Sequence, residues 1–312
     1  MNGTILLPEA FTRKRYLSDR YHILFDEIAS RLNWKIHVAN DIEEKEIEGN
    51  ILMALKCPQH DDPSRGANIP KLSKKIKVIS YTVDLQSCSR DYVENVKKVL
   101  ARSDLILCPY KHAFENRWPQ YVDKFEWFPH YFAPTSRYQN MEFRKSPIPK
   151  CIVAGAAFRP YPIRVKAVNS KGRNIYRLPH PGYNPKMCVS EINRFKFKVG
   201  LDYAQELNKY SCALTCTSIY EYVLAKHLEI PAARTIMLTN RCTDLRDLGF
   251  IPSKHYVEVT EANVVGVIDD VVNHREKYTH IAWDAYKHVW EIGRVEVSAE
   301  QFVELLRTRK WL

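Results

Sequence analysis

Residues 203–239 read YAQELNKYSCALTCTSIYEYVLAKHLEIPAARTIMLT and contain two short apolar runs with a longer mixed stretch between them. The runs, CALTC (212–216) and TIMLT (235–239), have the length and apolar content of buried strands. A helical segment between two such strands is the usual connection in a parallel sheet. This stretch therefore predicts a strand–helix–strand unit.

The same alternation extends in both directions along the chain. Strand-like runs in the second half are CIVAG (151–155), NIYRL (174–178) and HYVEV (255–259), and those in the first half are TILLP (4–8), KIHVA (35–39), NILMAL (50–55), KVISY (77–81) and DLILC (104–108). Helical patterns cover about 16–32 and 90–101. The alternation predicts an α/β protein with doubly wound, Rossmann-like sheets.

The length of 312 residues favours two medium domains. A proline-rich break, RKSPIPK (144–150), separates the two sets of strands. We therefore predict an amino-terminal acceptor domain over 1–148 and a carboxy-terminal donor domain over 149–295. Residues 296–312 are predicted to form a helix that packs back on the first domain. Two such domains are expected to face a central cleft, with ligands at the carboxyl ends of the strands.

Composition narrows the class of protein. Hydrophobic residues make up 45% and charged residues 27%, and no apolar run reaches the about 18 residues of a membrane span. The amino terminus has no basic stretch before its apolar patch, so it predicts a strand and a soluble, cytoplasmic protein. Cys212 and Cys216 are the only close pair among eight cysteines. Because no second pair lies at metal-site spacing, we expect buried free thiols and no metal.

The net charge of +11 is concentrated in one segment. Residues 141–200 hold 13 lysines and arginines and two acids, so the rest of the chain is balanced. Such a segment is either a solvated face or the binding surface for phosphates or a polyanion.

Two motifs in the second half resemble the donor-binding region of GT-B glycosyltransferases, especially the group that includes spore-maturation-protein-like enzymes. They are AKHLEIPA (225–232) and LGFIPSKHYVEV (248–259). The resemblance covers about 150–290 well, and it continues more weakly through SYTVDL (80–85) and RSDLILCP (102–109). It implies two Rossmann-like domains and a nucleoside-diphosphate sugar, of UDP or GDP type, as the donor.

The resemblance implies roles for the residues around the first motif. Glu229 would accept hydrogen bonds from both ribose hydroxyls, because two carboxylate oxygens match two adjacent donors. Glu221 would act in catalysis at the donor sugar or the diphosphate. On a regular helix the two side chains would point about 80° apart, so we predict that Glu221 lies in a turn. The remaining donor-binding candidates here are Ser218, Ile219, Tyr220 and Lys226. The alternative for the glutamates is two solvated acids.

The basic segment contributes the phosphate-binding candidates. In VAGAAFRPYPIRVKAV (153–168), a strand ends at Gly155 and a helix begins near Pro160 or Pro162. Such a turn directs backbone N–H groups at an anion, and Arg159 and Arg164 are predicted to bind the pyrophosphate. Cationic stabilisation of the leaving diphosphate would make a metal unnecessary. The alternative is two surface arginines at the start of a helix.

Further candidates lie in short loops. In RLPHPGY (177–183), His180 and Tyr183 are expected near the nucleotide, unless the proline–glycine pair only forms a turn. In the first half, Asp84 follows a predicted strand and is assigned a catalytic role at the acceptor. His130, in EWFPHYFAP, is also assigned a catalytic role, with a structural histidine as the alternative.

One departure from the resemblance follows EIPA. The family has a glycine before the next strand, whereas here Ala233 is followed by Arg234. The arginine is expected either to alter the end of the helix or to add a cation near the cleft.

Three functions remain open on the sequence. The first is transfer of a sugar, with retention and without a metal, to an unidentified acceptor hydroxyl. The second is a DNA-modifying transferase that acts on hydroxylated bases, with the basic segment and its interleaved aromatic residues tracking DNA or another polyanion. The third is a non-catalytic nucleotide-binding or nucleic-acid-binding module derived from a transferase.

Overall fold

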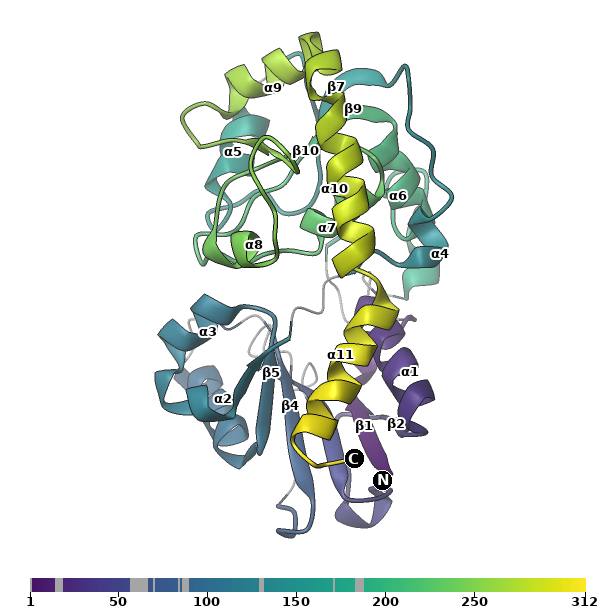
Figure 1. Ribbon diagram of the computed structural model, residues 1–312, viewed down its shortest axis with the longest axis vertical. Coiled ribbons are helices and arrows are strands. Elements are labelled where there is room, and N and C mark those ends of the chain that lie inside the picture. Colours follow the sequence, from purple (N-terminus) through teal and green to yellow (C-terminus); the bar gives the residue numbers. More distant parts are fainter. Residues whose placement is uncertain are drawn as a thin grey trace. The chain divides into compact units, whose positions relative to one another are not determined.

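A computed structural model describes residues 2–14, 19–56, 67–69, 71–83, 85, 90–128, 132–170, 172–182 and 188–312. The chain forms two compact units (Figure 1). Unit 1 comprises Met1–His130, Tyr183–Glu191 and Val295–Leu312, and unit 2 comprises Tyr131–Gly182 and Ile192–Arg294. The boundary between unit 1 and unit 2 thus first falls between residues 130 and 131, upstream of the proline-rich break at 144–150.

Unit 1 is built on a six-stranded sheet with the order β2-β1-β3-β4-β5-β6. All its strand pairs are parallel. The strands are β1 (Gly3–Leu7), β2 (Lys35–Val38), β3 (Ile51–Lys56), β4 (Lys77–Thr82), β5 (Leu105–Cys108) and β6 (Phe125–Trp127). Its helices are α1 (Arg20–Leu32), α2 (Arg90–Arg102), α3 (Lys111–Arg117) and α11 (Val295–Thr308), with short 3₁₀ turns η1 (Glu9–Phe11), η2 (Glu44–Glu46), η4 (Pro119–Lys124) and η5 (Val189–Glu191).

The central strands of unit 1 are continuously apolar because both faces of the sheet are covered. Residues 51–55 of β3 are fully buried, as is expected of a parallel sheet packed between helices. The last helix, α11, lies alongside α1 (Figure 1). Its Phe302 makes edge-to-face contacts with Trp34 at 5.9 Å and with Phe128 at 6.1 Å between ring centroids. The carboxy-terminal residues thus complete the core of the first unit.

Unit 2 is built on a five-stranded parallel sheet with the order β11-β10-β9-β7-β8. The strands are β7 (Ile148–Val153), β8 (Ile175–Arg177), β9 (Tyr210–Leu214), β10 (Ile236–Thr239) and β11 (Val257–Glu258). Its helices are α4 (Thr135–Tyr138), α5 (Pro162–Asn169), α6 (Leu201–Asn208), α7 (Lys226–Ala232), α8 (Thr243–Asp247), α9 (Val264–Asn273) and α10 (Thr279–Ile292), with the 3₁₀ turn η6 (Arg275–Tyr278). Helices α5 and α9 pack against β7, whereas α7 and α10 pack against β10.

The order of strands in unit 2 creates a topological switch point. The chain passes from β7 outward to β8 and then returns to β9 on the other side of β7. The loops after β7 and β9 therefore diverge at the carboxyl edge of the sheet. Open α/β sheets bind ligands in the crevice at such a point.

The predicted fold class is confirmed. Each of the ten predicted strands is present, and the two sheets are parallel and flanked by helices. Of the strands that the structure describes, the sequence missed β6, which has three half-buried residues and too short a pattern to recognise. Among the described residues, no helix combines the length and apolar character needed to cross a bilayer.

Candidate functional site

The site lies at the switch point of unit 2, where Gly155 follows β7. Gly155 has φ +90°, a conformation that side chains rarely adopt. A Cβ atom there would lie 3.0 Å from Cε and 3.3 Å from Nζ of Lys226, and 3.5 Å from Nη1 of Arg164. Glycine therefore suits the turn and leaves room for the end of the Lys226 side chain, whereas Arg164 Nη1 lies at ordinary contact distance.

Arg164 is the most buried charged side chain of this group, with 2% of its surface exposed. Its Nη1 donates to the carbonyl of Ala156 at 3.1 Å, and its Nη2 donates to Thr215 Oγ1 at 3.0 Å and to the carbonyl of Cys216 at 3.3 Å. The guanidinium stacks 4.5 Å from the ring centroid of Tyr161. Arg164 thus joins the loops that follow β7 and β9.

Among the described residues, Arg164 has neutral partners and no carboxylate contact. Its Nε is buried without a hydrogen-bond partner among them. A buried cation with only neutral acceptors keeps a large desolvation cost. An anion placed beside it would gain a strong, charge-assisted interaction.

Lys226 and His180 lie beside this centre. Lys226 is the first residue of α7, and its ammonium lies 5.6 Å from the ring centroid of Tyr203. Burial by the surrounding atoms and the charge of Lys226 lower the pKa of His180 to about 4. The Nδ1 of His180 accepts the backbone N–H of Gly182 at 2.9 Å. Because Nδ1 is an acceptor, the proton of the neutral imidazole lies on Nε2, which is then a hydrogen-bond donor.

The two glutamates occupy different backbone settings. Glu229 lies in the first turn of α7 and is half-buried, and its side chain has no hydrogen bond or ion pair to the described residues. Glu221 is exposed in the turn before α7, as predicted, with φ +59°. Its backbone N–H donates to the carbonyl of Ser218 at 2.9 Å, which supports this left-handed conformation. A non-glycine residue in that region costs about 1–3 kcal/mol and is often associated with a functional site.

Hydrogen bonds connect the loops after β7, β9 and β10. The backbone N–H of Ile219 donates to the carbonyl of Pro160 at 2.9 Å, and Ser218 Oγ accepts the N–H of Tyr220 at 3.1 Å. Asn240, immediately after β10, accepts the N–H of Thr217 at 3.0 Å and donates to its hydroxyl at 2.7 Å. Sequence reasoning missed Asn240, although a polar residue directly after the predicted strand TIMLT marked it.

The structure brings most of the sequence candidates to one edge. Gly155, Arg164, Lys226 and His180 form one cluster, and Ser218, Ile219, Tyr220 and Glu221 share the loop after β9. Arg159 is exposed on the loop after β7. Asp84, His130 and Tyr183 lie outside the described residues.

Arg234 is positioned by aromatic rings of α10. It adopts φ +55° just after α7, a conformation that favours glycine. Its guanidinium lies 4.2 Å from the ring centroid of Tyr286 and 4.9 Å from that of Trp283. Cation–π contacts of this kind contribute about 0.5–2 kcal/mol and offset the strain of the left-handed backbone.

The described cysteines form no metal centre. Cys212 and Cys216 are both buried free thiols, and burial raises the pKa of each. No cluster of histidine, cysteine and acidic side chains suited to a metal ion occurs among the described residues.

Several solved structures are similar to the whole chain. No protein-family model matches the sequence, and no curated protein is similar to it. Sucrose-phosphate synthase from Thermosynechococcus elongatus matches with a TM-score of 0.63 and 11% identity, over 99% of this chain and 98% of that one. Anabaena HepE, solved with UDP and glucose, matches with a TM-score of 0.64 and 11% identity, over 99% of this chain and all of the other. An alpha-glucosyltransferase solved with UDP-glucose and DNA matches with a TM-score of 0.62 and 9% identity, over 98% and 100%.

These similarities define the fold. All three neighbours are GT-B glycosyltransferases, and each is matched over nearly its full length. The two parallel sheets and their flanking helices agree with that architecture. The chain therefore has the GT-B fold.

Proposed function

We propose that the protein is a glycosyltransferase that moves a sugar from a nucleoside-diphosphate sugar to an acceptor hydroxyl. The observation that carries the proposal is the buried, uncompensated guanidinium of Arg164 beside Gly155 and Lys226. This centre lies at the switch point where α/β sheets bind nucleotides. The UDP and UDP-glucose bound by structural neighbours support the same class of donor.

The diphosphate is the part of the donor that suits this centre. Arg164 and Lys226 would contact its oxygens where Gly155 leaves room, and exposed Arg159 would add a cation from the same loop. Negative charge grows on the diphosphate as the glycosidic bond breaks, so fixed cations stabilise the transition state more than the ground state. Neutral His180 would donate from Nε2 without adding a charge.

The glutamates would bind the sugars at either end of the donor. Glu229, with no partner among the described side chains, would accept both ribose hydroxyls. Glu221 would contact the transferred sugar from its strained turn, and the turn Ser218–Ile219–Tyr220 would line the same region. We further propose retention of configuration and no need for a metal. Asp84 and His130 remain proposed for acceptor catalysis, and Tyr183 for nucleotide contact.

The variant Glu229→Gln tests the ribose contact. It keeps the size of the side chain and removes its charge, so we expect UDP to bind about 10–100-fold more weakly. The measurement is the rise in melting temperature with UDP, because a ligand bound only by the folded protein stabilises it. A parallel titration with GDP identifies the preferred base.

Glu261→Gln is the matched control, since Glu261 is exposed in the loop before α9. It should leave the UDP response unchanged. If UDP raises the melting temperature of Glu229→Gln and of the wild type equally, Glu229 does not bind the ribose. Release of free sugar from UDP-glucose without added acceptor would exclude a module that only binds.

A second candidate, DNA as the acceptor, is favoured by the loop around Phe195. Phe195 is 98% exposed, although an aromatic side chain usually avoids water. Asn193 Oδ1 accepts the N–H groups of Phe195 and Lys196, at 3.0 and 3.2 Å, and so holds the ring outward. Arg194, Lys196 and Lys198 lie within three residues of it in the sequence. Cations around a stacking ring are typical of single-stranded nucleic-acid binding, and one structural neighbour was solved with DNA.

The variant Phe195→Ala tests the DNA candidate. Loss of one stacked base should weaken binding of a labelled single-stranded oligonucleotide about 10-fold, measured by fluorescence anisotropy. Added salt should also weaken binding by the wild type, because phosphate contacts release counterions. Ile251→Ala, at another exposed apolar side chain, is the control. If neither added salt nor Phe195→Ala changes the affinity for the oligonucleotide, DNA is not the acceptor.

A further inference from the structure

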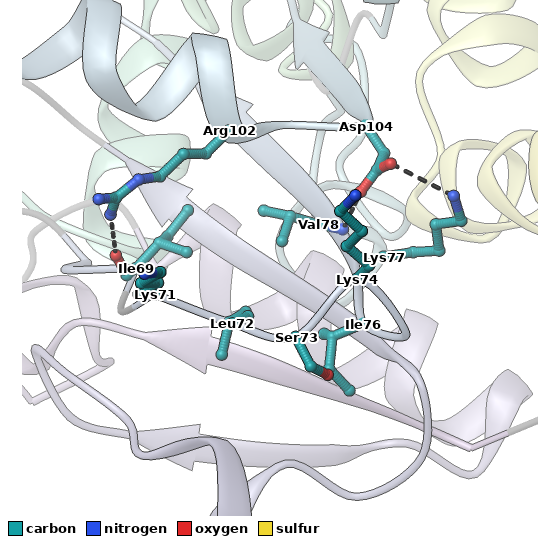
Figure 2. Close-up of a pocket in the computed structure, with 10 residues that line it drawn as sticks. All are labelled: Ile69, Lys71, Leu72, Ser73, Lys74, Ile76, Lys77, Val78, Arg102 and Asp104. Carbon is teal, nitrogen blue, oxygen red and sulfur yellow. Dashed lines mark hydrogen bonds and ion pairs between the residues drawn. The ribbon is translucent and has the colours of Figure 1, made fainter.

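Unit 1 contains a pocket at the amino ends of its strands, which we name the amino-edge pocket. Its volume is about 450 Å³, within the range of small-molecule sites. It lies between the loop 67–76, the start of β4 and the turn from α2 to β5 (Figure 2). This edge of the sheet is opposite the carboxyl edge, where α/β sheets bind substrates. The pocket is therefore separate from any transferase site of the first sheet.

The rim of the amino-edge pocket is cationic. Lys71, Lys74, Lys77 and Arg102 line it, and Asp104 is the only acid among the lining residues that the structure describes. The carboxylate of Asp104 is already engaged, because it accepts Lys77 Nζ at 3.3 Å and the backbone N–H of Val78 at 2.9 Å. The formal charge of the lining is thus positive after this pairing.

The remaining cationic side chains differ in whether they already have a hydrogen-bond or ion-pair partner. Arg102 Nη1 donates to the carbonyl of Ile69 at 2.9 Å, so this guanidinium helps to fix the wall (Figure 2). Lys71 and Lys74 are exposed, and neither forms an ion pair within the described residues. Glu44 accepts the backbone N–H of Ser73 at 2.8 Å, so its carboxylate is engaged with the loop between the two lysines. Two ammonium groups therefore remain available to an anionic ligand.

The floor of the amino-edge pocket is apolar. Ile69 and Val78 are 6% and 5% exposed, and half-buried Leu72 and Ile76 pack against the same hydrophobic cluster. Ile69 and Val78 are already shielded from water, so the apolar surface open to a ligand comes from Leu72 and Ile76. A ligand with an apolar body would bury that surface, at about 25 cal/mol per Å² of apolar area. The lining thus matches a molecule that is anionic at one end and apolar at the other.

We propose that the amino-edge pocket binds a small organic phosphate, with the phosphate between Lys71 and Lys74 and an aromatic or aliphatic body on the floor. A phosphate accepts hydrogen bonds from several ammonium groups at once, and lysine suits it as a compact point charge. A concave site with an apolar base favours a small molecule over an extended polyanion. The proposal is independent of the glycosyltransferase function.

Phenyl phosphate is a suitable probe because it combines both properties. Trp311 provides a reporter, since its ring centroid lies 5.8 Å from Nζ of Lys77 at the pocket wall. We expect phenyl phosphate to change tryptophan fluorescence in protein saturated with UDP, which blocks the donor site. The Trp311→Phe variant should lose this signal and keep the binding measured by calorimetry.

The double variant Lys71→Ala/Lys74→Ala tests the cationic rim. It should weaken phenyl phosphate binding at least about 10-fold, because it removes two charge-assisted contacts. The control Lys14→Ala/Lys98→Ala removes the same charge from exposed positions outside the pocket and should bind as the wild type does. Circular dichroism confirms that both variants fold.

Three results would overturn the proposal. The first is an unchanged affinity in Lys71→Ala/Lys74→Ala. The second is equal binding of inorganic phosphate and phenyl phosphate, which would show that the apolar floor plays no part. The third is binding seen only without UDP, which would place the probe in the donor site.

Discussion

Replacing Gly155 by valine is expected to abolish the stabilisation that UDP gives to the wild-type protein. The added side chain would occupy the space where Lys226 Cε lies 3.0 Å and Arg164 Nη1 lies 3.5 Å from the Cβ position. Both cations would have to move, and the diphosphate would lose the opening in which they converge. At about 100 times its Kd, UDP should raise the free energy of unfolding of the wild type by about 2.7 kcal/mol. We expect Gly155→Val to lose nearly all of this gain in a thermal or denaturant titration.

The effect of backbone strain in Gly155→Val must be distinguished from the loss of UDP binding. Valine at φ +90° would itself cost about 1–3 kcal/mol of folding free energy. Gly200→Ala is the matched control, because Gly200 also has positive φ and no atom lies within 4 Å of its Cβ position. It should lower the melting temperature and keep the full response to UDP. A Gly155→Val protein that still responds to UDP would contradict the proposed position of the diphosphate.

The variant Arg164→Met should reduce UDP affinity about 100-fold, equal to about 2.7 kcal/mol. Methionine keeps an unbranched side chain but removes the buried charge and its donors. The loss of affinity should depend on the phosphate groups. Uridine, which has none, should therefore bind Arg164→Met and the wild type equally. Isothermal titration with both ligands gives this comparison directly.

The stability of Arg164→Met without ligand should change less than its affinity. The carbonyls of Ala156 and Cys216 and the hydroxyl of Thr215 lose a donor, at about 1–3 kcal/mol each. Removal of a desolvated cation offsets part of that cost.

Arg275→Met is the control for Arg164→Met. Arg275 stacks on Phe143 at 4.6 Å and donates to the carbonyl of Arg144, outside the site. Its loss should destabilise the protein and leave both affinities unchanged. Equal losses for UDP and uridine in Arg164→Met would point to a collapsed loop instead of a missing charge.

The fold could be predicted because parallel strands produce a strong local signal. Runs such as NILMAL and CALTC are apolar throughout, since both faces of each sheet are covered. The turn at Glu221 was also predictable, because helical geometry would have separated it from Glu229. By contrast, β6 is short and half-buried, so its periodicity carried too little information.

The details of the site depend on contacts between distant segments. Composition placed Arg164 in a basic stretch, but only the packing of α5 against the loop after β9 buries it at 2% exposure. Asn240 pairs with Thr217 across 23 residues of sequence. At position 234 the resemblance led us to expect a glycine, and only the contacts of Arg234 with the rings of α10 account for a cation there. Likewise, the sequence did not single out Lys71, Lys74 and Lys77, which come together only where β4 and the turn after α2 form one pocket with them.

Packing of α11 into unit 1 has a consequence for the order in which the protein matures. A ribosome adds about 5–20 residues per second, so the stretch of about 170 residues from His130 to Phe302 takes on the order of ten to thirty seconds. Throughout that time Trp34 and Phe128 lack their edge-to-face contacts with Phe302, which has not yet been made. Unit 2 has all its residues once Arg294 is made, so the unit translated later can mature first. The nascent chain therefore carries an uncovered hydrophobic face that chaperones can recognise until α11 has been made.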